Sequence, residues 1–288
     1  MRRLRKLIHL STTGFSFGRY YEMMNLALKR LNNEFTMLHY PLFRHENDSF
    51  LRAQQNLTDY CLSFFKDLSG KHLLEIGCGN GVQALYVHRN FKPARTIGID
   101  LNRANIDIAE QECTALGLKE EIRFMVDDAQ KLAGIPSESI DVLINIESAF
   151  HYPDKGAFLN EIHRVLKPGG QFVVADILTR KKFGRLQRIW QKRMVYHYWS
   201  RHNYEAGFEN AELDIVHSED ITPKIIRAYG LYKNWIPKTK RKTFLKDTAF
   251  RLFYIINVRL NVRLLKKRQS YHVFYGIKPG MEQMRKTA

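Results

Sequence analysis

From Gly70 to Asp176 the chain alternates short apolar runs with helix-like segments, and this alternation constrains the fold more than any other feature of the sequence. Strands separated by helices favour a parallel, doubly wound sheet, because each helix returns the chain across one face of the sheet. Lys167-Pro-Gly-Gly170 is typical of a helix stop and a turn before the last of these strands. The expected strands are 72–76, 96–99, 122–126, 142–146 and 171–175, and the expected helices are 81–90, 102–116 and 157–166.

Both flanks of this segment have a different pattern. Residues 20–31 and 49–65 show apolar positions at three- and four-residue spacing and are expected to be helices, with Pro41 in the break between them. We therefore predict an α/β fold, with a doubly wound seven-stranded sheet and a helical cap from both flanks. Its parts are an N-terminal cap (1–56), a ligand-binding core (57–178), and cap helices with the last two strands (179–288). In that last part we expect helix at 181–202 and 224–268 and strands at 213–217 and 271–277.

The charge is concentrated on the flanks. The net charge of +17 divides into +5 for residues 1–56, −5 for 57–178 and +17 for 179–288. Basic flanks suit an anionic membrane surface, a nucleic acid or an acidic substrate, whereas the alternative is a solvated surface. Residues 240–268 mix bulky apolar and basic side chains, so this stretch is expected either to lie on an anionic membrane or to pack on the core with a solvated face.

Three features bear on location. The sequence contains no run of 18 apolar residues that could span a bilayer. The apolar stretch within residues 1–10 is too short for the core of a signal peptide. The three cysteines are scattered, which predicts neither a disulfide framework nor a metal site. We expect a cytoplasmic protein, peripheral to a membrane if the basic helices bind one. The oligomeric state stays open, with a homodimer as one alternative.

The segment Leu73-Leu-Glu-Ile-Gly-Cys-Gly-Asn-Gly81 ends the first expected strand with three glycines. Glycine lets the backbone turn tightly and approach a ligand at the N-terminus of the next helix. Dinucleotide enzymes use a related loop, so the glycines alone do not identify the ligand. Glu75 precedes the first glycine by two positions, and a carboxylate there suits an ammonium group better than a pyrophosphate. The alternative for Glu75 is a surface carboxylate at a strand end.

Acidic residues also end the second and third expected strands. Asp100 stands where a carboxylate can accept both ribose hydroxyls of an adenosine. Asp128 can accept a hydrogen bond from an adenine amino group, with the Ala129 amide against the ring. Asp127 could share this contact or serve as a turn residue, and we favour Asp128. Three acidic strand ends in this order after a glycine loop form a specific pattern.

These motifs resemble those of class I S-adenosylmethionine (SAM)-dependent methyltransferases, through LLEIGCGNG (73–81), GIDLN (98–102), DDAQ (127–130) and RVLKPGG (164–170). The resemblance covers residues 57–178. It implies a Rossmann-like fold, SAM as the cofactor, and the methionine portion over the end of the fourth strand. The expected cofactor contacts are Glu75, Gly77, Gly79, Gly81, Asp100, Leu101, Asp128, Ala129, Asn145 and Ile146.

The fourth expected strand runs into Asn145-Ile-Glu-Ser-Ala-Phe-His-Tyr-Pro-Asp154. The carboxyl ends of parallel strands face the ligand crevice, so His151 is expected to point toward the methyl donor. A hydroxyl acceptor must lose a proton, and histidine is a fitting base near pH 7. Asp176, at the end of the fifth strand, is the candidate for a second carboxylate that orients His151 or shares the proton. The alternatives are a structural loop histidine and a turn carboxylate.

The same segment, with Ala175-Asp-Ile177, resembles small-molecule O-methyltransferases of the rebeccamycin sugar O-methyltransferase type. That resemblance implies a metal-independent base pair of histidine and aspartate, although the group often has two adjacent histidines where this chain has Phe150-His151. A looser resemblance, through Tyr40-Pro-Leu and residues 271–279, is to phthiotriol and phenolphthiocerol dimycocerosate methyltransferases, which act on lipid-like hydroxyls. Their histidine stands one position earlier than His151.

The first functional hypothesis is therefore O-methylation of a hydroxyl on a hydrophobic small molecule or lipid-like metabolite. The second is C- or N-methylation of a quinone-like, sterol-like or amine metabolite. A nucleic-acid methyltransferase is disfavoured, because the chain lacks an Asn/Asp-Pro-Pro-Tyr motif and a recognisable RNA-binding module. Tyr20 and Tyr21 are expected to close over the cofactor. The expected acceptor lining, with core packing as the alternative, is Phe183, Trp190, Met194, Tyr196, Tyr198, Trp199 and Tyr204.

Overall fold

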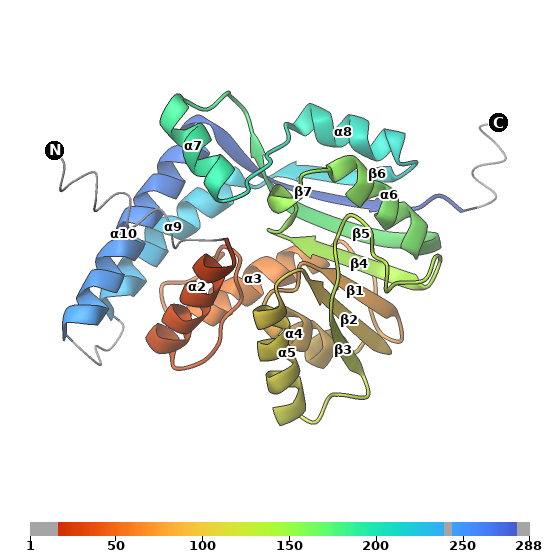
Figure 1. The fold of residues 1–288 in the computed structure, drawn as a ribbon, viewed down its shortest axis with the longest axis horizontal. Helices are drawn as coiled ribbons and strands as arrows, with labels where there is room; N and C mark the ends of the chain where they lie inside the picture. The colour runs from red at the N-terminus through yellow and green to blue at the C-terminus, as the bar shows by residue number, and fades with distance from the viewer. Residues whose placement is uncertain (1–16, 239–243, 281–288) are drawn as a thin grey trace.

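The computed structural model describes residues 17–238 and 244–280, and its centre is a seven-stranded sheet in the order β3-β2-β1-β4-β5-β7-β6 (Figure 1). The first five strands are parallel, and β7 pairs antiparallel with both β5 and β6. The α/β doubly wound prediction is thus confirmed. The strands are β1 (His72–Ile76), β2 (Arg95–Asp100), β3 (Ile122–Val126), β4 (Ile140–Ile146), β5 (Leu166–Thr179), β6 (Asp214–Asp220) and β7 (Gln269–Ile277).

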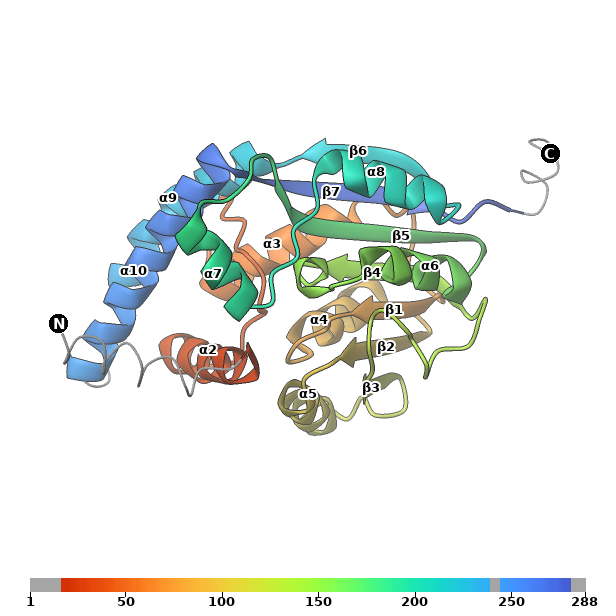
Figure 2. The ribbon, with the colours of Figure 1, turned by 45° about the horizontal axis from the view of Figure 1, so that its top comes forward.

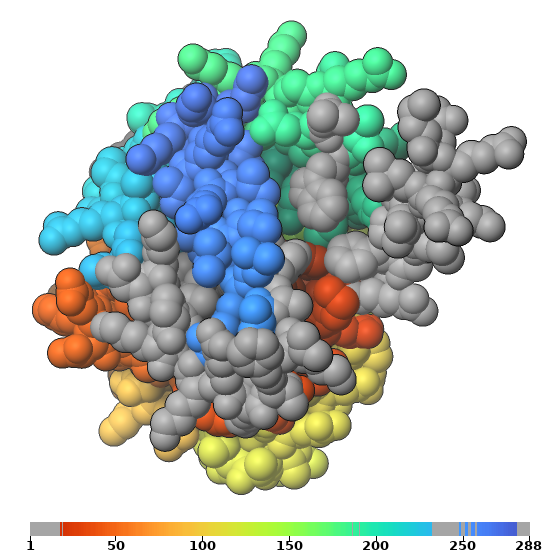
Figure 3. All heavy atoms as spheres, turned by 90° about the vertical axis from the view of Figure 1, so that its left-hand side faces the viewer, coloured from red at the N-terminus to blue at the C-terminus, as the bar shows by residue number. Residues whose placement is uncertain are grey.

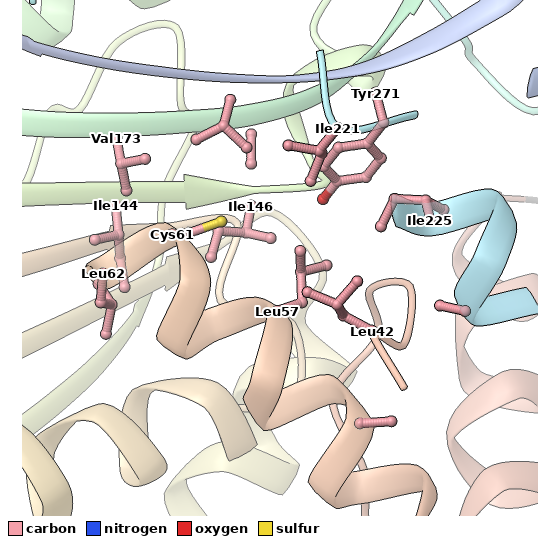
Figure 4. Packing of buried hydrophobic residues seen from close by; sticks show 14 of the residues in the cluster. Leu42, Leu57, Cys61, Leu62, Ile144, Ile146, Val173, Ile221, Ile225 and Tyr271 are labelled. Carbon is pink, nitrogen blue, oxygen red and sulfur yellow. The ribbon is translucent and has the colours of Figure 1, made fainter. Parts of the chain in front are cut away.

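Helices cover both faces of the sheet because successive strand side chains point to opposite sides. Leu73 of β1 belongs to the cluster under α3 (Phe50–Leu62), where Cys61 lies beside Ile146 and Leu62 below Ile144 of β4 (Figure 4). Leu74 faces the other side and packs with residues of two further helices. Those helices are α6 (Lys155–Val165) and α8 (Arg201–Asn210), while α4 (Val82–Phe91) and α5 (Arg103–Ala115) lie beside β2 and β3.

The N-terminal flank is helical at both predicted places. α2 spans Phe17–Asn32 and α3 spans Phe50–Leu62, with an irregular stretch that contains Pro41 between them. α3 begins at Phe50 because the Ser49 side chain accepts a hydrogen bond from the Arg52 amide. The basic N-terminus, residues 1–16, lies outside the described residues.

The single helix expected at 181–202 is wrong. The structure has α7 (Arg185–Arg193), then a non-helical stretch at 194–200, and then α8. Val195 has φ +54, which ends the helical path, and Ser200 caps a new helix by accepting from the Asn203 amide. The stretch is tied across the strand ends by His197 N to Phe150 O and Thr179 N to Trp199 O. Long-range hydrogen bonds have therefore overridden the local helical pattern.

Lys167-Pro-Gly-Gly170 ends the preceding helix as expected, but the predicted turn before the strand is wrong. These residues belong to β5 itself, which begins at Leu166. The pairing with β4 jumps from Ile140↔Leu166 to Val142↔Gln171, so the extra residues form a bulge. Gly169 takes φ +76 there, and its amide bonds the carbonyl of Lys278.

The long insertion at 224–268 is a pair of helices, α9 (Thr222–Lys238) and α10 (Phe244–Lys267), which lie side by side (Figures 1 and 2). Residues 239–243, which include Lys242, lie outside the described residues. α10 returns the chain to β7, the middle strand of the antiparallel edge. No helix in the described ranges combines the length and the apolar character needed to cross a membrane.

Candidate functional site

A cavity of about 350 Å³ lies at the carboxyl ends of β1, β2 and β4, as expected for an open parallel sheet. We call it the glycine-loop cavity. Eight of the ten predicted cofactor contacts line it, and Gly81 and Asn145 do not. The predicted residues in its wall are Glu75, Gly77, Gly79, Asp100, Leu101, Asp128, Ala129 and Ile146.

The loop needs its glycines for different reasons. Gly77 has φ +71, and a Cβ there would lie 2.3 Å from Ser148 Oγ. Gly79 has φ +54, and its amide donates to Asp100 Oδ2 at 2.9 Å. Gly81 is the N-cap of α4 with φ +77, and its Cβ would lie 2.5 Å from that of Ala109. Gly81 is not among the described residues of the cavity wall, and it allows α4 and α5 to approach closely.

Glu75 supplies an unpaired buried oxygen. Its side chain is 3% exposed, and Oε2 has no hydrogen-bond partner among the described residues. Burial, with a smaller effect of Asp100, holds the pKa of Glu75 well above its ordinary value. Burial of a carboxyl oxygen without a hydrogen-bond partner costs free energy of folding unless a bound ligand supplies the partner. An ammonium group of a ligand fits this position.

The second and third strand ends use their carboxylates differently. Asp100 accepts from the Gly79 amide and, at 2.8 Å, from the Asn102 amide, so it ties the glycine loop to β2. Asp127 accepts from the loop amides of Asp128 and Gly134 at 2.8 and 2.9 Å, which is the role of a turn residue. Both Asp127 and Asp128 face the glycine-loop cavity.

Asn145 is fully buried, and it is not among the described residues that line the cavity. Neighbouring strand residues face opposite ways, and Ile146 takes the cavity side. The Asn145 amide donates to Ile76 O at 3.0 Å and to Ser148 Oγ at 2.7 Å. It therefore fixes the loop after β4 against the end of β1.

A chain of buried asparagines joins α2 to the cofactor loop, and sequence reasoning missed it. Asn25 of α2 donates to Asn105 Oδ1 at 2.9 Å and accepts from Asn80 Nδ2 at 2.8 Å. Asn105 in turn donates to Asp100 Oδ1 at 3.3 Å. Residues from α2, the glycine loop and α5 meet here, although they are separated by as many as 80 positions. Asparagine carries no helical or strand periodicity that would reveal such a contact.

A second cavity of about 950 Å³ adjoins the first, and we call it the aromatic cavity. Its wall comes from α2, residues 37–41, the start of α3, α7, residues 196–198, α9 and α10. The two cavities share Tyr21, Met37, Leu38, His39 and Glu147 in their walls. The aromatic residues that line it are Tyr20, Tyr21, Tyr40, Phe50, Phe150, Phe183, Tyr196, Tyr198 and Tyr229.

The predicted acceptor lining divides into wall and core. Phe183, Tyr196 and Tyr198 line the aromatic cavity. Met194 and Tyr204 are buried in the core, and Trp199 packs edge-on against Tyr204. The side chain of Trp190 lies outside the described atoms. The non-helical stretch at 194–200 explains the division, because its residues do not follow one helical face.

His151 lies on the short 3-10 helix η1 (Ala149–His151) and lines the glycine-loop cavity. Its Nδ1 faces Val195 O at 3.2 Å, and its Nε2 faces the Tyr21 hydroxyl at 2.8 Å. A carbonyl can only accept, so we assign the ring hydrogen to Nδ1, and Nε2 then accepts from the Tyr21 hydroxyl. Burial lowers the pKa of His151 to about 3, and Tyr21 therefore donates to a neutral ring.

The expected contact between His151 and Asp176 is wrong. Asp176 is fully buried on β5, and it is not among the described residues that line either cavity. Its carboxylate accepts from the Phe150 amide at 3.1 Å and from the Tyr204 hydroxyl at 2.6 Å. Burial raises the pKa of Asp176 to about 6. Asp176 thus holds η1, the element that carries His151, rather than the imidazole itself.

Glu147, between the strand end and η1, is a site residue that the sequence reasoning did not select. It has φ +52, a left-handed conformation that side chains rarely adopt. Its Oε1 accepts from the Tyr40 amide at 2.7 Å. Burial raises the pKa of Glu147 to about 8. In the described part of the chain, no three His, Cys, Asp or Glu side chains are grouped to hold a metal ion.

Residues 74–174 match the family model described as a methyltransferase domain. The chain is 40% identical over 114 residues to a fatty-acid O-methyltransferase of Mycolicibacterium smegmatis, a match that covers 40% of each chain. It is 34% identical over 161 residues to a phthiotriol/phenolphthiotriol dimycocerosates methyltransferase of Mycobacterium leprae, covering 56% of this chain and 51% of the relative. The match thus spans about half of each relative's length or less.

A solved structure has the same fold over most of the chain. It is the geranyl diphosphate C-methyltransferase from Streptomyces coelicolor A3(2) in complex with Mg²⁺, geranyl diphosphate and S-adenosyl-L-homocysteine. The TM-score is 0.69 at 17% identity, covering 91% of this chain and 96% of that one. Residues 74–174 thus match a methyltransferase domain, and the chain shares the Rossmann-like fold of the solved methyltransferase.

Proposed function

We propose that this protein transfers the methyl group of SAM to a hydroxyl on a hydrophobic, lipid-like acceptor. The observation that carries the proposal is the junction of the two cavities, whose shared wall places a polar cofactor site next to a large aromatic chamber. Chambers lined by aromatic side chains with few polar groups bind apolar ligands. The relatives named for fatty-acid and phthiotriol substrates support an acceptor of this class.

The chain's own residues would hold the two reactants in line. SAM supplies an electrophilic methyl on a sulfonium, and the displacement depends on how closely the acceptor oxygen is positioned. Glu75 would pair with the ammonium group, Asp100 with the ribose hydroxyls and Asp128 with the adenine amino group. The aromatic cavity would hold the apolar body of the acceptor and exclude water from its reacting end.

His151 would act on the acceptor through Tyr21. Tyr21 lines both cavities and its hydroxyl faces His151 Nε2 at 2.8 Å, so the two side chains would together orient the acceptor hydroxyl. Asp176 would position η1 through the Phe150 amide. We therefore expect His151→Ala to lower kcat by about tenfold, as an upper-range hydrogen-bond effect of about 1.4 kcal/mol, while SAM affinity stays unchanged.

The experiment offers a long-chain alcohol, the matching fatty acid and the matching amine with isotopically labelled SAM. Transfer of label to the alcohol, with the methyl carbon on oxygen by NMR of the product, supports the proposal. The competing outcomes are an ester from the fatty acid alone, an N-methyl product, or a C-methyl product from a prenyl acceptor. Each of these would replace the hydroxyl acceptor and contradict the proposed reaction. A wild-type rate in His151→Ala would contradict the proposal that His151 acts on the acceptor through Tyr21.

We further propose that α10 rests on an anionic membrane. Leu252, Ile256 and Leu260 recur every four residues and are 58%, 47% and 53% exposed. Figure 3 shows α10 on the face where α7 and α2 also reach the surface. Ile256 and Leu260 also line the aromatic cavity, so a lipid acceptor could enter there from the bilayer. The exposed cations of this helix segment are Arg259, Arg263, Lys266 and Lys267.

Vesicle co-sedimentation tests this contact. We expect the protein to bind vesicles that contain anionic lipid, and we expect salt to weaken this binding. The double variant Leu252→Glu/Ile256→Glu should bind less, because each change removes apolar area that the membrane would bury and adds repulsion from the anionic lipid. Leu101→Glu is the control, because Leu101 is exposed at the glycine-loop cavity and lies outside α10. Equal binding to neutral vesicles, or an unaffected double variant, would contradict the proposal.

A further inference from the structure

We propose that Glu147 is the group that takes the proton from the acceptor hydroxyl during methyl transfer. This inference rests on the proposed function and deepens it. Among the described residues that the two cavity walls share, Glu147 is the one carboxylate. It therefore stands where the methyl donor and the acceptor oxygen must meet.

Glu147 reaches this position through a strained backbone conformation. It is the first residue beyond β4, and its φ of +52 is left-handed. The Glu147 amide bonds Ala175 O of the neighbouring strand at 2.8 Å, which fixes the main chain after the strand end. A residue without special purpose at such a position is usually glycine or asparagine. Strain held by surrounding structure is a feature of functional sites.

The surroundings leave Glu147 weakly acidic. Burial has the largest effect and raises the pKa, hydrogen bonds with the Tyr40 amide and the Tyr271 side chain lower it, and repulsion by Asp176 raises it further. Because no cation is among the groups that shift its pKa, the neutral carboxyl is favoured below a pKa of about 8. A base whose pKa lies near the working pH combines availability with driving force. The other titratable groups facing it are Tyr21, Tyr40, Cys61, Asp176, Tyr229 and Tyr271.

His151 fits the proton-accepting role less well. Its Nε2 lone pair already accepts from the Tyr21 hydroxyl, and burial opposes formation of an imidazolium. The acceptor O–H bond breaks, its proton passes to a Glu147 carboxylate oxygen, the oxygen electron pair forms the new C–O bond, and the C–S pair leaves with sulfur. The proton then returns to solvent, and no further reactant is required.

The first test compares Glu147→Gln with Glu212→Gln. Glu212 is an exposed glutamate with φ +54, so it controls for the same substitution in the same backbone region. Glu147→Gln should lower kcat at least about 100-fold, the usual range for loss of a general base, while SAM affinity stays within about twofold. Glu147→Asp should retain part of the rate. Glu212→Gln should match the wild type.

The pH profile separates Glu147 from His151. The wild-type rate should rise as pH increases through about 8 and then level, because the deprotonated carboxylate is the active form. The same rise should persist in His151→Ala and vanish in Glu147→Gln. A flat wild-type profile, or a rise that disappears in His151→Ala alone, would overturn the proposal. An O-methylated product made at full rate by Glu147→Gln would overturn it while leaving the proposed function intact.

An infrared titration gives a readout that does not depend on turnover. The protonated-carboxyl band should lose the intensity of one group in the wild type as pH is raised through about 8, and this loss should be missing in Glu147→Gln. A wild-type spectrum without a carboxyl that titrates in this range would overturn the assignment. A product methylated only on carbon or nitrogen would overturn the assignment and the proposed function together, and the product NMR distinguishes this case.

Discussion

The two cavities are built from different kinds of chain segment. The glycine-loop cavity takes most of its wall from the ends of consecutive parallel strands between residues 75 and 153. The aromatic cavity takes its wall from segments as far apart as Tyr20 and Gln269. Strand ends converge by the topology of the sheet alone, whereas the aromatic wall depends on how the flanks fold back. Substitutions in the first should therefore affect SAM, and those in the second should affect the acceptor.

The largest effect is expected at Gly77, where an added methyl meets both a left-handed backbone and Ser148. Gly77→Ala should weaken SAM binding at least about 100-fold, or about 2.7 kcal/mol, by calorimetry. Gly70→Ala is the matched control, because Gly70 has φ +69 with nothing within 4 Å of its Cβ position. Equal losses in the two variants would show that backbone strain, not the shape of the loop, governs binding.

Asp100→Ala should weaken SAM binding about tenfold, or about 1.4 kcal/mol, because the ribose partner and the tie to Gly79 are both lost. The acceptor KM should stay within error if the two cavities are independent. Asp107, an exposed aspartate of α5 paired with Arg103, provides the control substitution. Unchanged affinity in Asp100→Ala would remove the ribose assignment.

The aromatic cavity should show the opposite pattern. Tyr198 lies in its wall and stacks on Phe150 with ring centroids 6.0 Å apart. Tyr198→Leu should raise the acceptor KM about fivefold, or about 1 kcal/mol, without a change in SAM affinity. Phe91→Leu serves as control, since Phe91 is an aromatic residue distant from both walls. An equal loss of SAM affinity in Tyr198→Leu would show that the two cavities do not bind their ligands independently.

The smallest effect is expected where the two regions are connected. Asn25→Ala removes the hydrogen bonds from α2 to Asn80 and Asn105, so both SAM affinity and acceptor KM should worsen by about threefold, or about 0.6 kcal/mol each. Asn32→Ala, which loses only a bond to its own helix at Leu28, should change neither. A change confined to one ligand would show that α2 belongs to that site alone.

The sequence predicted the parts of the site that follow periodic rules. The bounds of β1 and β3 agree with expectation, and the positions of Glu75 and Asp100 follow from strand ends after a glycine loop. Gly81 and Asn145 are not among the described residues that line the glycine-loop cavity, and a motif does not reveal which of its positions face a cavity. Glu147 was overlooked for the same reason: a residue just past a strand has no periodicity to place it.

The sequence by itself determined the α/β fold and its cofactor edge, because strand alternation and turn residues act over a few positions. The tertiary structure decided the rest. The stretch at 194–200 is non-helical because its backbone groups bond Phe150 of η1 and Thr179 of β5, which are 47 and 20 positions away. It is this stretch that brings Val195 to His151, while β5 takes Asp176 away from it. Contacts between distant segments depend on packing of the whole molecule, and no local pattern encodes them.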